Sequence, residues 1–209
     1  MELIRVDTHR AYKLIREMII TLELEPGQPL DEGKLAQELD MAQIPVREAL
    51  RLLIHDHLVE APPRGLYISD INIDDLKKIS DIRLHMEPLS ARQAVQNATE
   101  DDITVLDALC QEQVTEIRQL LELDHKFHQA IALSTHNKYL ADVLEHFFGL
   151  SQRLWYLVLP QLDFLPGAVE SHIELTEAIK TRDADKAEKL MYAHIEGFYN
   201  KISKILKDL

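Results

Sequence analysis

The stretch that decides the N-terminal fold is residues 31–68, DEGKLAQELDMAQIPVREALRLLIHDHLVEAPPRGLYI. Asp31 can cap a helix over 32–39, because its carboxylate can accept a backbone N–H of the first turn. The next four residues are few enough for a tight turn. Pro45 suits the first position of a following helix, which we expect to run to about residue 57.

Two short β-like pieces, 58–60 and 66–68, flank the turn residues 61–65 and predict a hairpin. A helix over 10–22 comes before the quoted stretch, with its apolar residues on one stripe. Helix, helix, short turn, helix and hairpin is the order of a winged helix-turn-helix.

The remainder of the chain reads as helical, so we expect a mainly α protein whose C-terminal part is an antiparallel bundle of about six helices. The expected helices span 73–97, 99–116, 118–135, 138–159, 167–181 and 183–207. The expected domains are a winged helix-turn-helix over 1–69, a linker over 70–73 and an all-helical effector domain over 74–209.

Composition narrows the class of protein. Of the 209 residues, 46 % are hydrophobic and 28 % are charged, which is typical of a globular fold. Cys110 is the single cysteine, which excludes an internal disulfide framework and fits a reducing cytoplasm. We see no signal peptide and no run of about 18 apolar residues, so we expect a cytoplasmic protein without a membrane partner. The net charge of −13 disfavours nonspecific nucleic-acid binding but leaves room for a local DNA-reading surface.

Four residues in two distant pairs are candidates for a metal site. Asp124 and His128 are four residues apart, so they share one face of a helix. His172 and His194 lie eleven residues before and after Asp183, which marks a helix break, so they fall at the same height on an antiparallel pair. Three imidazoles and one carboxylate suit Zn²⁺, Ni²⁺, Mn²⁺ or Fe²⁺. An isolated Asp/His pair at this spacing is more often a surface pair or a capped core histidine, and it is the symmetry about the turn that favours a metal.

The geometry of such a site stays open at this point. Four protein ligands could close a tetrahedral structural site, whereas octahedral geometry would leave two positions for water or a ligand carboxylate. Arg83 and Arg153 are the cations that we expect near a bound anion, and Trp155 could line the pocket. The alternative for Arg83 is an ion pair with Glu87 within its own helix, and the alternative for Trp155 is core packing.

These residues resemble a known family. Lys34-Leu35-Ala36 and Pro45-Val46-Arg47-Glu48-Ala49-Leu50 resemble the DNA-binding domain of GntR-type bacterial regulators. The sequence Arg83-Leu84-His85-Met86-Glu87, then Asp124-His125-Lys126-Phe127-His128, His172 and His194, resembles the FCD-type effector domain of the FadR branch. The resemblance implies a cytoplasmic, homodimeric transcriptional regulator, expected to be a repressor, that reads a palindromic operator. It also implies a small carboxylate or sugar-acid effector bound over a metal ion.

The DNA-reading surface departs from that family. Ala42, Gln43 and Ile44 stand where members commonly carry Ser or Thr, Arg and Thr, so an arginine–guanine contact is missing and Gln43 could read adenine instead. Between Met41 and Tyr67 the sequence contains three arginines and three acids, so this segment is less basic than most DNA-binding surfaces. The residues expected to contact DNA are Gln43, Arg47, Arg51, Arg64 and Gly65. The alternative for Arg47 is a salt bridge to a neighbouring acid.

Two other functions compete with a metabolite-responsive regulator. A helical metalloenzyme could use open metal positions to activate water, but the chain shows no second acid/base pair for chemistry, so we do not expect an enzyme. A metal-dependent metabolite sensor that reads DNA poorly would explain the departures at residues 42–44.

Overall fold

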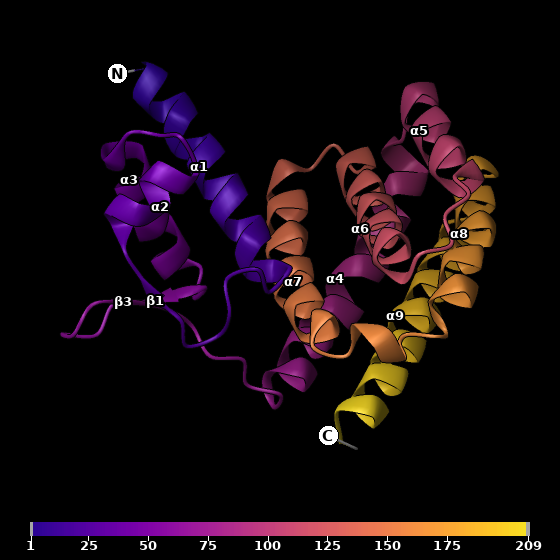
Figure 1. The fold of residues 1–209 in the computed structure, drawn as a ribbon. Coiled ribbons are helices and arrows are strands. Elements are labelled where there is room, and N and C mark those ends of the chain that lie inside the picture. Colours follow the sequence, from indigo (N-terminus) through magenta and orange to yellow (C-terminus); the bar gives the residue numbers. More distant parts are fainter. Residues whose placement is uncertain (1, 208–209) are drawn as a thin grey trace. The chain divides into compact units, whose positions relative to one another are not determined.

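The computed structural model describes residues 2–207, with side chains from residue 6 onward. The chain divides into two compact units, Met1–Asn72 and Ile73–Leu209, drawn in Figure 1.

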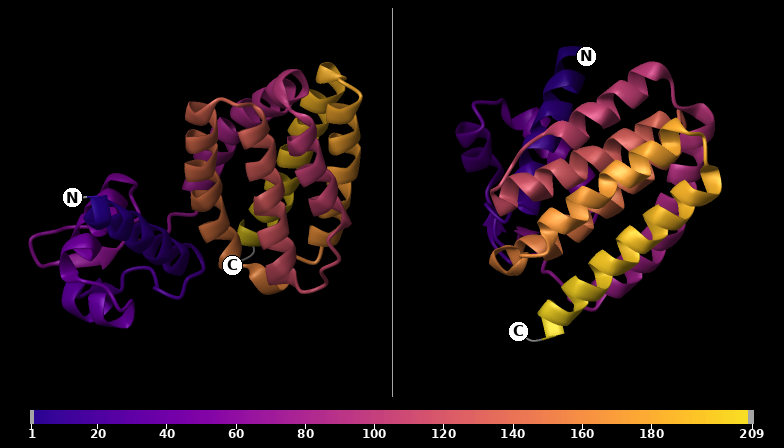
Figure 2. Two further views of the ribbon diagram at one scale, coloured as in Figure 1. Left: turned by 90° about the horizontal axis from the view of Figure 1, so that it is seen from above. Right: turned by 90° about the vertical axis from the view of Figure 1, so that its right-hand side faces the viewer.

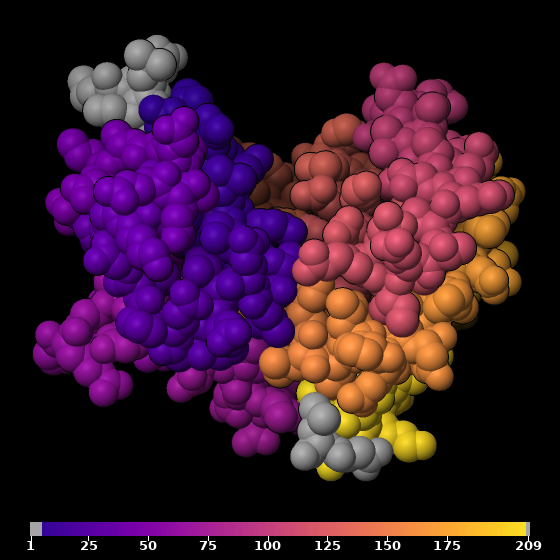
Figure 3. Space-filling view, viewed as in Figure 1, coloured from indigo at the N-terminus to yellow at the C-terminus, as the bar shows by residue number. Residues whose placement is uncertain are grey.

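The first unit contains helices and a small sheet in the order expected for a winged helix-turn-helix. Its helices are α1 (Glu2–Ile20), α2 (Glu32–Glu38) and α3 (Gln43–His55), and its strands are β1 (Pro29–Leu30), β2 (Val59–Glu60) and β3 (Leu66–Ile68). The sheet is antiparallel in the order β1-β3-β2, and the hairpin between β2 and β3 projects from the unit (Figure 3). The first helix starts earlier than the expected 10–22, and β1 was not expected.

The core of this unit forms where the apolar faces of its helices pack together. The Asp31 carboxylate accepts the Lys34 N–H at 2.9 Å and caps α2 as expected. Pro45 lies in the first turn of α3, where its missing N–H costs no hydrogen bond. The apolar stripes meet at residues that are at most 3 % exposed: Ala11, Ile15, Ile19, Leu35, Ala36, Val46, Ala49, Leu50 and Leu53.

The C-terminus of α3 is closed by a left-handed residue. His57 has φ +61°. The His57 N–H donates to Ile54 O, and the Leu58 N–H donates to Leu53 O at 2.9 Å. This is a Schellman motif with histidine at the position where glycine is favoured.

The second unit is a bundle of helices (Figure 2). Its helices are α4 (Asp75–Asn97), α5 (Glu100–Gln111), α6 (Ile117–Ser134), α7 (Lys138–Tyr156), the 3-10 helix η1 (Leu159–Gln161), α8 (Leu165–Lys180) and α9 (Ala184–Lys207). Six α-helices within the described residues agree with the expected bundle. The expectation for α5 was wrong at its end, because the helix stops at Gln111 rather than at residue 116.

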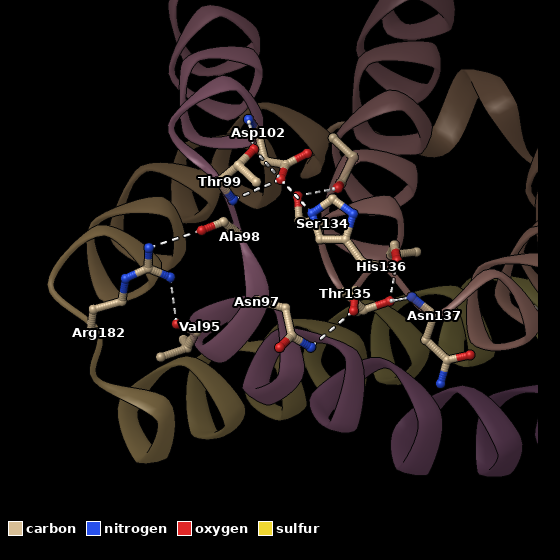
Figure 4. Close-up of polar contacts among 12 residues, drawn as sticks. Val95, Asn97, Ala98, Thr99, Asp102, Ser134, Thr135, His136, Asn137 and Arg182 are labelled. Atoms are coloured by element: carbon tan, nitrogen blue, oxygen red, sulfur yellow. Dashed lines mark hydrogen bonds and ion pairs between the residues drawn. The ribbon is translucent and has the colours of Figure 1, made fainter.

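Side chains join the helix ends at one end of this bundle (Figure 4). Arg182, with φ +60°, donates to Val95 O at 2.6 Å and to Ala98 O at 2.9 Å, which ties the α8–α9 turn to the last carbonyls of α4. His136 lies 2.9 Å from the Asp102 carboxylate, which also closes the capping box of α5. The Arg182 contacts hold the turn about which His172 and His194 are arranged.

Among the described helices, none combines the length and the apolar character needed to cross a bilayer.

Candidate metal centre

The four residues picked out by spacing converge inside the second unit. Asp124 and His128 come from α6, His172 from α8 and His194 from α9. Each of the four side chains is at most 5 % exposed. The four-residue spacing on α6 and the symmetric turn between α8 and α9 therefore bring the expected side chains together.

The donor atoms lie close enough together to share one ion. Asp124 Oδ1 lies 3.2 Å from His172 Nε2, 3.6 Å from His194 Nε2 and 3.7 Å from His128 Nε2. His128 Nε2 and His194 Nε2 are 3.1 Å apart. An ion about 2.1 Å from each donor places neighbouring donors roughly 3.0–3.4 Å apart, depending on geometry. The donor set therefore fits a divalent transition metal.

Two of these donor atoms are otherwise left without a partner of acceptable geometry. Asp124 Oδ1 and His172 Nε2 are buried, and neither makes a hydrogen bond with the described residues. Buried polar atoms without hydrogen bonds are costly unless they bind an ion or water. This supports the fit of the site to a metal.

The ring nitrogens of two imidazoles that point away from the centre also have partners. His128 Nδ1 forms a close ion pair with Glu87 of α4. His194 Nδ1 lies 2.8 Å from Ser171 Oγ, which donates to Ala168 O. Partners of this kind fix which ring nitrogen would face a bound metal.

Burial and neighbouring charges set the ionisation of the site. Burial raises the pKa of Asp124, but the surrounding histidines, His128 first, lower it by more, so it lies well below its usual range. Burial lowers the pKa of His172 to about 4, so its imidazole is neutral near pH 7 and can act as a ligand. Burial also lowers the pKa of His128, but Glu87 and Asp124 outweigh this and the net shift is upward.

Arg83 combines the two roles weighed for it. Its Nε donates to Glu87 Oε1 at 2.5 Å, which is the ion pair within α4. Its guanidinium also lies 4.6 Å from the ring centre of Phe148 and 5.1 Å from that of Trp155. Arg83 and Trp155 line a cavity together with Asp124, His128 and His194. The cavity measures about 10 Å³, which is room for a single water at most.

Arg153 is placed differently. It is 4 % exposed on α7, but it is not among the residues that line this cavity. Of the two expected arginines, Arg83 is the one that lines this cavity.

The residues expected to contact DNA lie on the surface of the first unit. Arg47 Nε donates to Glu32 Oε2 at 2.7 Å, which is the alternative considered for it, and Arg51 donates to Glu48 Oε1 at 2.7 Å. Gln43 begins α3 and its amide lies over α2, so a methyl group at Gly33 would come within 2.8 Å of Gln43 Nε2.

The remaining two residues expected to contact DNA, Arg64 and Gly65, lie at the hairpin tip. The Arg64 guanidinium lies 5.0 Å from the ring centre of Tyr67. Gly65 has φ +133°, a conformation that side chains disfavour, and its N–H donates to Pro62 O.

Two contacts were not predicted from the sequence, that of Glu87 with His128 and that of Ser171 with His194. Glu87 was considered only as the partner of Arg83 within one helix. A buried acid flanked by apolar residues on α4 is the signal that could have marked it. Sequence spacing alone does not predict that His128 of α6 is the partner of Glu87.

Comparisons with known proteins agree with this architecture. The family model described as "Bacterial regulatory proteins, gntR family" matches residues 7–66, and the FCD domain model matches residues 78–197. The chain is 26 % identical to the HTH-type transcriptional regulator YdhC of Bacillus subtilis (strain 168), over 94 % of this chain and 91 % of that protein. It is 26 % identical to the HTH-type transcriptional repressor RspR of Escherichia coli (strain K12), over 94 % and 89 %.

A solved structure has the same fold. E. coli McbR/YncC superposes with a TM-score of 0.82 at 20 % identity, covering 96 % of this chain and 98 % of that one. The family and the relatives are transcriptional regulators rather than enzymes, so the metalloenzyme alternative is wrong. A winged helix-turn-helix followed by an FCD domain thus places the chain in the GntR family of bacterial transcriptional regulators, whose members bind DNA operators.

Proposed function

We propose that this regulator binds one divalent transition metal ion and a small carboxylate effector in its FCD domain, and that the effector alters operator binding. The observation that carries the proposal is the convergence of four buried donor atoms from three helices on one point. The residues that would hold the ion are Asp124, His128, His172 and His194. When bound, the ion would supply a positive charge that anchors an anion.

Arg83 is the residue that we assign to the effector. It meets Glu87 through Nε, so the end of the guanidinium that grips carboxylates with two parallel bonds is not used by that pair. Its contacts with Phe148 and Trp155 hold the group in place beside the metal ligands. A carboxylate between Arg83 and the ion would meet positive charge on both sides.

The small cavity indicates how an effector would act on the fold. A volume of about 10 Å³ cannot hold a metabolite beside the ion, so the walls must separate. Leu76 and Ser80 from the start of α4 form one wall, and Phe198 and Tyr199 from the end of α9 form another. Because α4 begins just after the boundary with the DNA-binding unit, an effector that prefers the opened bundle would move the start of the helix that leads there.

We assign operator contacts to Arg47, Arg51, Arg64, Gly65 and Gln43. The ion pairs of Arg47 and Arg51 are exposed to solvent and therefore weak, so phosphate oxygens can replace their acidic partners. A homodimer would present two α3 helices about 34 Å apart to a palindromic site. RspR is named a repressor, and we infer repression for this chain as well.

The second candidate is a metal-dependent sensor with weak DNA specificity. The pairing of Arg47 and Arg51 with acids, together with Gln43 lying against α2, favours it.

The test is selection of genomic fragments by the protein, followed by sequencing. Metal-loaded and chelator-treated samples are compared at two salt concentrations, with metal content measured in each. A shared palindrome with steep salt dependence supports the regulator, whereas sequence-blind binding supports the sensor. The metal site is supported if the wild type binds about one ion per chain and His172→Ala binds none. Full occupancy in that variant contradicts it.

A further inference from the structure

Glu87 is a buried acid that touches two groups with different roles. It is 3 % exposed on α4. Its Oε1 accepts the Arg83 Nε–H, and its Oε2 forms the close ion pair with His128 Nδ1. The proposed metal ligands come from α6, α8 and α9, so this carboxylate connects a fourth helix to the site.

The contact with His128 has a direct consequence for metal binding. An imidazole can offer the Nε2 lone pair to a metal only when its proton is on Nδ1. A carboxylate that accepts the Nδ1–H holds that tautomer, orients the ring and makes Nε2 more basic. Glu87 Oε2 forms a close ion pair with His128 Nδ1, which puts the carboxylate where it can accept that proton, and His128 Nε2 lies among the other donor atoms.

The contact with Arg83 connects the same carboxylate to the effector cavity. Arg83 lines that cavity, and its positive charge offsets part of the charge of Glu87. An effector carboxylate that engages Arg83 would draw the guanidinium toward itself. The pull of Glu87 on His128 would then increase, and metal and effector would each bind more tightly in the presence of the other.

We propose that Glu87 is a positioning residue that fixes His128 for metal binding and couples effector occupancy at Arg83 to the metal site. The inference rests on the proposed function, since it requires a metal at the four ligands. The competing explanation is that Glu87 only neutralises a buried arginine within α4.

Three variants separate these explanations: Glu87→Gln, Arg83→Gln, and the double variant Arg83→Gln/Glu87→Gln. Glu122→Gln, on the exposed face of α6, is the matched control. Affinity for Zn²⁺ and Co²⁺ is measured by competition with a chromophoric chelator, and folding is followed by circular dichroism.

We expect Glu87→Gln to lower metal affinity about 10–100-fold, with a changed absorption spectrum of the Co²⁺ form. Arg83→Gln keeps metal affinity at or above that of the wild type, because Glu87 still holds His128 and no longer shares its charge with the guanidinium. The double variant leaves no buried charge without its partner, so it tests the proposal even if Glu87→Gln does not fold. Its metal affinity stays as low as that expected for Glu87→Gln.

Nitrogen NMR of the Zn²⁺ form provides a readout that a merely structural role would not move. In the wild type, we expect the His128 Nδ1–H proton to be strongly deshielded by the Glu87 carboxylate, and we expect that shift to be reduced in Glu87→Gln. Wild-type metal affinity in the double variant overturns the inference, because Glu87 would then serve only Arg83. A wild-type protein that binds no metal overturns the proposed metal site and the inference together, so the two failures are distinguishable.

Discussion

The imidazole of His172 lies flat against the phenyl ring of Phe127, with ring centres 3.9 Å apart and planes 6° from parallel. Phe127 is fully buried and follows the core face of α6. The stack holds the His172 ring with Nε2 toward Asp124. The core of the bundle therefore orients this candidate ligand.

Replacing His172 with alanine should abolish the stabilisation of the protein by metal. The variant loses one of four donors, so saturating Zn²⁺ should no longer raise the midpoint of thermal unfolding. For the wild type, ligand at 100 times Kd should add about 2.7 kcal/mol. Calorimetry with and without Zn²⁺ measures this difference. His136→Ala is the control, since His136 is exposed and pairs with Asp102 away from the donor set; an equal loss there would mean that the effect is not specific to the site.

Acid should destabilise the metal-free protein through its buried carboxylates. Burial raises the pKa of Glu87, but Arg83 and His128 lower it by more, so it falls from 4.5 to about 2. The pKa of Asp124 also lies well below its usual value. Their stabilisation is complete above the unfolded pKa values and is lost as pH falls through the folded ones. Urea unfolding should therefore show stability falling from about pH 4.5 toward pH 2.

The variant Glu87→Gln should flatten that fall, whereas Glu122→Gln should leave it unchanged. The shifts of His128 and His172 act above pH 4 and in opposite directions, because the first is raised and the second lowered. The carboxylate effect is therefore measured below pH 4. An equally steep decline in Glu87→Gln would contradict the assignment to this residue.

Glycine at position 57 should stabilise the DNA-binding unit. His57 has φ +61° at the end of α3, where a side chain costs conformational energy that glycine avoids. We expect His57→Gly to raise the free energy of unfolding by about 0.5–1 kcal/mol. His55→Gly is the matched control because His55 is helical and exposed, so it should lower the same quantity by roughly 0.3–0.5 kcal/mol. Chemical denaturation decides, and destabilisation by both substitutions would refute the prediction.

The sequence predicted most of the architecture, because apolar periodicity and caps are local signals. The stripe of Val46, Ala49 and Leu50 and the cap at Asp31 both appear in the structure. β1 was missed because two residues carry no periodicity and pair with a strand far along the chain. The early end of α5 lies in a stretch without a proline or glycine to mark it.

The candidate site was predictable to the same extent. The spacing of His172 and His194 about Asp183 placed them side by side, with ring centres 5.0 Å apart. The contact between Glu87 and His128 depends on how α4 packs beside α6, and the closed cavity depends on the packing of whole side chains. Neither quantity is encoded in local spacing.

Arg182 should contribute to stability through the end of α4. Its guanidinium bonds to Val95 O and Ala98 O, two carbonyls with no partner in the next turn of their helix. Arg182→Ala removes a charged donor from both, and each such bond is worth roughly 1.5–3 kcal/mol, so we expect a loss of about 2–4 kcal/mol. Arg118→Ala, an arginine that stacks on Tyr156 instead, is the comparison. A loss under about 1 kcal/mol for Arg182→Ala, measured by urea unfolding, would show that water replaces the guanidinium.

Substitutions of the two partners in the Arg47–Glu32 ion pair should change DNA affinity in opposite directions. If Arg47 contacts a phosphate, Arg47→Ala should weaken binding to all DNA sequences and reduce the slope of log K against log salt by about one. Glu32→Gln should strengthen binding, because it frees Arg47 and removes a negative charge beside α3. The salt dependence is measured by fluorescence anisotropy with the operator and with unrelated DNA. Lys34→Ala, on the same helix as Glu32 and paired with Glu38, is the control for a general change in charge. If Glu32→Gln weakens binding as much as Arg47→Ala does, the pair serves to hold α2 against α3, and the DNA contact must be sought at the hairpin tip.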